Sequence, residues 1–287
     1  MVLGVFITFR ILDFPDLTVD GSFPLGAAIF ASMVTSGIPI LPAILAAFAG
    51  GILCGIVTAV IHNKLKVPSL LAGILTMTML YSVNIRVLGN KANLPLLGVS
   101  TAISKVSALS QSVFNGKIPE SWAVLLFFVI ISLSIKYLLD LFFHTDLGLT
   151  LGALGSNEQM IVSQGVNPEL LKIIGVGLSN GIVALSGAFA AQYQGFADVN
   201  LGQGIVITGL ASVMIGEFLI RSNKIELLTL RVILGSILFK GIMFLGRYYG
   251  YYINLTPNDL KLITGLMIIF SLALTKWKKN AGFLRKA

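Results

Sequence analysis

The stretch HTDLGLTLGALGSNEQMIVSQGVNPELLKIIG, residues 144–175, interrupts a chain that otherwise consists mostly of long apolar segments. It is polar and glycine-rich, and it carries two helix-start signals. Ser156 and Asn157 are favourable N-cap residues, and Gly165 suits a left-handed helix end. The tripeptide Asn-Pro-Glu at 167–169 then combines a capping residue, a proline at the first helical position and an acid in the first turn. The pattern predicts a helix of about two turns and a second helix that leads into the next apolar segment.

Such a short helix needs support from the rest of the protein. Helix nucleation costs more free energy than two turns of hydrogen bonds return, so the helix must pack against something. The apolar side chains in and before it are Leu151, Leu154, Met160, Ile161 and Val162. We expect part of this surface to lie on the body of the protein and the rest to face a partner.

The composition places that body in a membrane. Of the 287 residues, 56% are hydrophobic and 11% are charged, and the mean hydropathy is +0.92, values outside the usual range of soluble domains. A crossing helix needs about 20 mainly apolar residues. We therefore expect an all-α polytopic membrane protein with one transmembrane domain, residues 1–287. Seven stretches are long enough to cross: 39–61, 68–88, 121–142, 173–192, 200–218, 226–247 and 259–275. Two shorter ones, 1–12 and 24–36, bring the total to about nine transmembrane or half-membrane helices.

The basic residues predict the orientation. The net charge of +8 comes from Lys and Arg at segment ends and in the tail KWKKNAGFLRK, which indicates topology rather than nucleic-acid binding. If that tail is cytoplasmic and nine segments alternate in direction, most basic residues lie inside, and so does the segment 144–172. Residues 98–114, GVSTAISKVSALSQSVF, are expected to form a short helix at the outer surface. The single cysteine, Cys54, excludes an intrachain disulfide.

Residues 146–202, DLGLTLGALGSNEQMIVSQGVNPELLKIIGVGLSNGIVALSGAFAAQYQGFADVNLG, resemble the central region of ABC importer permeases. They are most similar to ribose and branched-chain amino-acid permeases, whose short cytoplasmic coupling helix, with G-x-N and a following G-[IV]-[ND], docks into an ATPase subunit. The matching residues are Gly155, Asn157, Gly165, Val166 and Asn167. Residues 16–28, DLTVDGSFPLGAA, resemble an early segment of the same family.

This resemblance implies a type II-like importer permease in the bacterial plasma membrane. The implied partners are an ABC ATPase subunit, an extracellular solute-binding protein, a second permease copy and membrane lipid. The coupling contacts it implies are Leu154, Gly155, Ser156, Asn157, Glu158, Met160, Gly165 and Asn167. Many relatives carry Arg-Ala where Gly152 and Ala153 stand, so one ionic contact with the ATPase is expected to be missing. Residues 9–28 and 184–217 are most similar to a branch associated with tryptophan or tyrosine uptake, which implies an amino-acid substrate.

Other function classes fit less well. The chain has no G-x-x-x-x-G-K-[ST] motif, so ATP and Mg²⁺ are expected on the partner ATPase, with no cofactor or metal in this chain. No nucleophile–base set is visible, and His62 and His144 are far apart in sequence, which argues against an enzyme. A secondary transporter driven by an ion gradient remains the alternative; it would need an acid inside the bundle, for which Asp198 and Glu217 are candidates. A membrane scaffold without transport is a third class.

Two segments suggest a substrate pathway. Residues 14–19 and 196–201 share the pattern F-x-D-[LV]-x-[VL], as expected of inverted repeats whose broken helices line a central site. The pathway candidates are Phe14, Asp16, Asn180, Tyr193, Phe196 and Asp198. Structural alternatives stay open for each: Asp16 and Asp20 as helix caps, Asn180 as an interhelical hydrogen-bonding group, and the aromatic residues as interfacial anchors.

Charged pairs at helical spacing complete the predictions. Glu217 and Arg221, and likewise Lys136 and Asp140, are four residues apart, which favours structural ion pairs.

Overall fold

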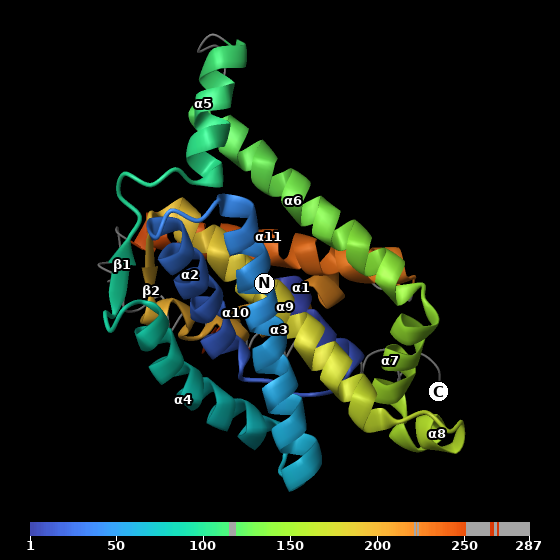
Figure 1. Ribbon diagram of the computed structural model, residues 1–287. Coiled ribbons are helices and arrows are strands. Elements are labelled where there is room, and N and C mark those ends of the chain that lie inside the picture. The colour runs from blue at the N-terminus through green and yellow to red at the C-terminus, as the bar shows by residue number, and fades with distance from the viewer. Residues whose placement is uncertain (115–118, 221, 223, 251–264, 267–268, 270–287) are drawn as a thin grey trace. The chain divides into compact units, whose positions relative to one another are not determined.

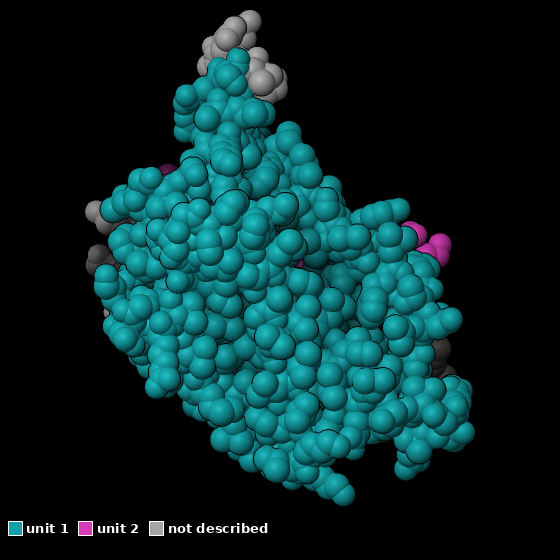
Figure 2. Space-filling model, viewed as in Figure 1, with its two compact units in different colours: residues 1, 3–205 teal, residues 2, 206–287 magenta. Residues whose placement is uncertain are grey.

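The computed structural model describes residues 1–114, 119–220, 222, 224–250, 265–266 and 269 (Figure 1). Most of the predicted span 259–275, and the basic tail after it, lie outside these residues. The contacts divide the chain into two compact units, residues 1 and 3–205 and residues 2 and 206–287 (Figure 2). The prediction of a single domain over residues 1–287 stays a prediction.

The described chain is mainly helical. Its helices up to residue 202 are α1 (Val2–Phe6), the π-helical turn η1 (Ile7–Ile11), α2 (Val19–Thr35), α3 (Ile40–Leu65), α4 (Ser69–Val87), α5 (Ala102–Phe114), α6 (Glu120–Phe143), α7 (Asp146–Ser156), α8 (Glu158–Ser163), α9 (Pro168–Gln194) and the 3₁₀ turn η2 (Val199–Gly202). They are followed by α10 (Ile205–Leu219) and α11 (Ile225–Gly250). Two short strands, β1 (Asn93–Pro95) and β2 (Phe196–Asp198), complete the set.

Six segments of the described chain are long and apolar enough to cross a membrane. They cover residues 40–65, 69–87, 120–143, 168–194, 199–219 and 225–246, which overlap six of the seven predicted spans. Shorter apolar helices cover residues 2–11 and 19–35. The multi-pass helical architecture is confirmed, and the count of nine stays a prediction.

Two helix starts differ from the prediction, and one helix was not predicted. α2 begins at Val19 rather than Pro24, so Pro24 lies inside the helix. A proline there removes the hydrogen bond to the carbonyl of Asp20, and Gly202 lies directly against that carbonyl oxygen. α10 begins at Ile205, because the preceding residues form β2 and η2. α7 was not predicted as a helix, since its three glycines have low helix propensity.

The core of unit 1 is built by α2, α3, α4 and α9, with α9 packed along both α2 and α3 (Figure 1). Small residues let these backbones come close. A Cβ added at Gly26 of α2 would overlap the carbonyl oxygen of Ala184, and one at Gly51 of α3 would overlap that of Asn180. The helices are therefore in direct backbone contact, which fixes the positions of their polar side chains.

β1 and β2 pair antiparallel, with Asn93 opposite Asp198 and Pro95 opposite Phe196. This pairing joins the segment after α4 to the segment after α9. The all-α prediction does not include these two strands. The predicted outer helix in residues 98–114 is present as α5. Thr101 and Ser104 cap its start reciprocally, and Gln192 Oε1 of α9 accepts from the Ala102 N–H at 2.9 Å.

In unit 2, α10 and α11 pack at backbone distance. A Cβ at Gly216 would overlap the Arg231 carbonyl oxygen, and one at Gly235 would overlap that of Ser212. The guanidinium of Arg231 donates to Glu217 Oε1 at 3.0 Å. Glu217 therefore forms an ion pair with a residue of the neighbouring helix, whereas the prediction paired it with the residue four positions further along the chain. Its predicted partner Arg221 lies outside the described residues.

Candidate functional site

The segment 144–172 forms two short helices before α9, and both begin at capped ends. Thr145 Oγ1 accepts from the Gly148 N–H at the start of α7. Asn157 Oδ1 accepts from the Met160 N–H at 3.1 Å and starts α8. Of the two predicted caps, Asn157 fills the role. Ser156 is instead the last residue of α7, and its hydroxyl donates to the Ala153 carbonyl.

The turn from α8 into α9 follows the predicted pattern. Gly165 has a φ of 78°, a left-handed conformation that glycine adopts without steric cost. Asn167 Oδ1 accepts from the Glu169 N–H at 2.9 Å, and Pro168 is the first residue of α9. The Asn157 cap and the left-handed Gly165 thus determine where the six-residue helix α8 begins and ends.

The apolar residues of this segment divide into two groups. Leu151, Leu154 and Ile161 are buried in unit 1. Met160 and Val162, on α8, are exposed at 47% and 55%. α8 is thus held by one buried side chain and presents two exposed ones, in agreement with the predicted division.

The charges around α8 are already paired. Glu158 Oε1 lies 2.9 Å from Lys172 Nζ, and Asn63 Nδ2 of α3 donates to the Glu169 carbonyl at 3.0 Å. The ion pair neutralises the acid of α8, and the hydrogen bond ties the foot of α9 to the end of α3. The exposed surface of α8 therefore combines the apolar Met160 and Val162 with polar side chains, and its one acid is paired.

Gly155 places α7 against the N-terminal part of the chain. A Cβ at this position would overlap the carbonyl oxygen of Ile11, the last residue of η1. At the foot of α9, Gly175 packs on the side chain of Leu12. The two glycines enclose Ile11 and Leu12 between α7 and α9.

A polar network lies inside unit 1, among α2, α3 and α9. Asn180 Nδ2 donates to Asp16 Oδ2 at 2.7 Å, and Ser22 Oγ donates to Asn180 Oδ1 at 2.7 Å. The Thr18 N–H donates to Asp16 Oδ1 at 2.8 Å, as expected of an acid at a helix start. Thr18 and Thr58 join their hydroxyls at 2.7 Å. All five residues are fully buried.

The other pathway candidates lie elsewhere. Phe14 is buried with its ring edge-on to His62 at 5.1 Å. Tyr193, at the far end of α9, is 68% exposed and packs edge-on to Phe128. Phe196 and Asp198 belong to β2, where Asp198 Oδ1 accepts from the Asn200 N–H at 2.7 Å.

The structure therefore brings only Asp16 and Asn180 together among the predicted pathway residues. The hydroxyls of Ser22, Thr18 and Thr58 were missed. The sequence alone does not distinguish these three residues, because serine and threonine in apolar helices usually form hydrogen bonds with the backbone of their own helix.

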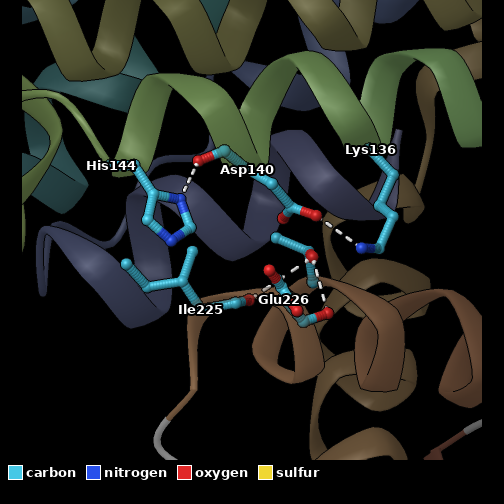
Figure 3. Close-up of polar contacts among 6 residues, drawn as sticks. Lys136, Asp140, His144, Ile225 and Glu226 are labelled. Carbon is cyan, nitrogen blue, oxygen red and sulfur yellow. Dashed lines mark hydrogen bonds and ion pairs between the residues drawn. The ribbon is translucent and has the colours of Figure 1, made fainter.

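The predicted pair on α6 is confirmed. Lys136 and Asp140 form an ion pair one turn apart, and His144 Nδ1 contacts the Asp140 carbonyl oxygen at 2.6 Å (Figure 3). The three residues follow one face of α6 down to the start of α7, so this ion pair lies next to the capped segment.

Comparison with known proteins agrees with these features. Residues 1–272 match the family described as the permease component of the branched-chain amino acid transport system. The chain belongs to this permease family. Its members are transport subunits rather than enzymes, and the permease is a multi-pass membrane protein of a bacterial ABC transport system.

Individual relatives show similarity along most of the permease. It is 42% identical to a tyrosine transport system permease protein of Clostridioides difficile over 95% of this chain and 86% of the relative. It is 34% identical to an uncharacterised protein of Rickettsia prowazekii over 96% and 93% of the two chains. A ribose import permease protein of Haemophilus influenzae is 27% identical over 78% and 67%. No solved structure gives a significant match.

Proposed function

We propose that this permease is the membrane subunit of an ATP-driven importer for a small solute, an aromatic amino acid such as tyrosine. The observation that carries the proposal is the geometry of α8. It is a six-residue helix, capped by Asn157, held by buried Ile161 and exposing the apolar Met160 and Val162. A short helix that exposes two apolar side chains, with its acid already paired, suits insertion into a groove of a partner protein. On this proposal the partner is a separate ATPase that binds ATP and Mg²⁺.

The substrate class comes from the relatives. One relative, 42% identical, is a tyrosine transport system permease protein. The full assembly we propose contains two permease copies of about nine crossings each, two ATPase subunits and an extracellular solute-binding protein. Exposed Tyr193, with Phe196 and Asp198 nearby in sequence, suits an outer entrance to the pathway, whereas Phe14, Asp16 and Asn180 suit its interior.

Reconstitution tests the proposal directly. The permease is co-expressed with its candidate ATPase, purified, and placed in liposomes with the solute-binding protein and labelled tyrosine. We expect uptake that requires ATP and continues when ionophores collapse the ion gradients. Gly155→Arg combined with Asn157→Pro should abolish this uptake while docking of the solute-binding protein persists. ATP-dependent uptake that is unchanged in this double variant would disprove the coupling role of α8.

One observation favours a second function, transport driven by an ion gradient. Asp16 is fully buried, and among the described residues no Lys, Arg or His forms an ion pair with it. Buried acids of this kind occur in proton and ion carriers. The same liposomes separate the two functions, because uptake by a secondary transporter would need no ATP and would stop with the ionophore.

A further inference from the structure

The chain between η1 and α2 joins the coupling region to the interior of unit 1. We call residues 11–18 the connecting segment. At one end its Ile11 carbonyl lies against Gly155 of α7, and its Leu12 side chain lies against Gly175 of α9. At the other end Asp16 is bonded to Asn180 of α9, and Thr18 is bonded to Thr58 of α3.

The contact at the α7 end transmits displacement well. Because Gly155 has no side chain, the α7 backbone touches the Ile11 carbonyl directly, with no flexible group between them. Leu12 is buried and cannot swing into solvent. Close-packed interiors have low compressibility, so a shift of α7 must move the connecting segment.

The contact at the Asn180 end is a strong one. An amide N–H that donates to a carboxyl oxygen in a buried interior makes a charge-assisted hydrogen bond when the acid is ionised. Asn180 Oδ1 simultaneously accepts from Ser22, in the first turns of α2. Asn180 is thus held from two sides, by the connecting segment and by the helix that follows it.

Resting on the proposed function, we propose that Asp16, Ser22 and Asn180 position α9 for coupling. When the ATPase displaces α8 and α7, the connecting segment carries that displacement to the middle of α9. Breaking the Asp16–Asn180 bond should reduce the solute imported per ATP hydrolysed.

An exchange of the two side chains tests the pair. Asp16→Asn places an amide N–H against another donor, and Asn180→Asp places two carboxyls side by side. The double variant Asp16→Asn with Asn180→Asp restores a donor opposite an acceptor. In reconstituted liposomes we expect each single variant to lower the solute-to-ATP ratio about tenfold, the scale of one lost charge-assisted hydrogen bond. The double variant should recover most of that loss.

Two serines provide a matched comparison that avoids charge changes. Ser22 Oγ bonds to Asn180, whereas Ser179 Oγ bonds to the Gly4 carbonyl at 2.7 Å, and both serines are fully buried. Ser22→Ala should lower the solute-to-ATP ratio. Ser179→Ala should lower thermal stability to a similar extent and leave the ratio unchanged.

The outcomes separate the two proposals. If the unmodified complex shows no ATP-dependent uptake, the proposed function fails. If it does import solute, equal ratios in Ser22→Ala and Ser179→Ala overturn the positioning role. Single variants of Asp16 and Asn180 that keep the ratio overturn it as well. Should those single variants fail to fold, the two serine variants alone decide.

Discussion

Single glycines determine how closely the helices approach one another. Gly26 lies where α2 meets the Ala184 carbonyl, so Gly26→Ala must push the two helices apart. Overpacking of this kind costs about 1–3 kcal/mol of folding free energy. We expect a clear fall in the thermal unfolding temperature in detergent. Gly241→Ala on α11 is the control, because a Cβ there has open space around it and should be tolerated. Equal unfolding temperatures for the two variants would contradict this account of the packing.

The sequence predicts hydrogen bonds between neighbouring residues well, and those between residues far apart in the chain poorly. Asn157, Gly165 and Asn167 act on neighbouring backbone groups, so their roles follow from residue type and spacing. Asp16 and Asn180 are 164 positions apart, and their bond depends on how α2 and α9 pack. The sequence identified both as pathway candidates, but only the folded structure shows that they contact each other.

Among the elements, α8 depends most on its cap. Asn157→Ala removes the acceptor for the Met160 N–H and should destabilise the helix by about 1 kcal/mol. We expect faster hydrogen exchange in residues 158–163 and a lower rate of ATP-driven uptake. Asn157→Asp keeps an acceptor oxygen and serves as the control. The prediction fails if both variants exchange as slowly as the unmodified permease.

The start of α5 depends on α9. Gln192→Leu removes the acceptor for the Ala102 N–H, a partly buried hydrogen bond worth about 0.5–1.5 kcal/mol. Hydrogen exchange in residues 102–104 should become about tenfold faster. Gln194→Leu, at an exposed position two residues further along, should leave it unchanged. Similar exchange in the two variants would show that Gln192 does not hold α5.

The elements also show the limits of sequence patterns. Hydrophobic stretches located the long helices because crossing helices need many apolar residues. The strand pairing of residues 93–95 with 196–198 could not be predicted, since each strand is three residues long and their pairing is long-range. α7 was missed for a different reason: its glycines weaken helix propensity but permit the close contacts with Ile11 and Phe142 that support it.

The orientation of the whole molecule can be tested with its single cysteine replaced. In a Cys54→Ala background, we expect Leu97→Cys to react with a membrane-impermeant thiol reagent added outside intact cells. Leu97 is 86% exposed and follows β1. Val162→Cys on α8 should react only after the cells are opened. Labelling of Val162→Cys from outside would reverse the topology and exclude docking of a cytoplasmic ATPase on α8.

α9 runs without a break for 27 residues, from the cap at Asn167 to the left-handed Gly195. At 1.5 Å per residue it is about 40 Å long, and Asn180 lies close to its midpoint. Because an unbroken helix is stiff, a displacement delivered at Asn180 would move both ends of α9 together. On the proposed function, the strand pair that follows α9 would then shift with the α8 end, and one continuous helix would link the side that meets the ATPase to the side that meets the solute.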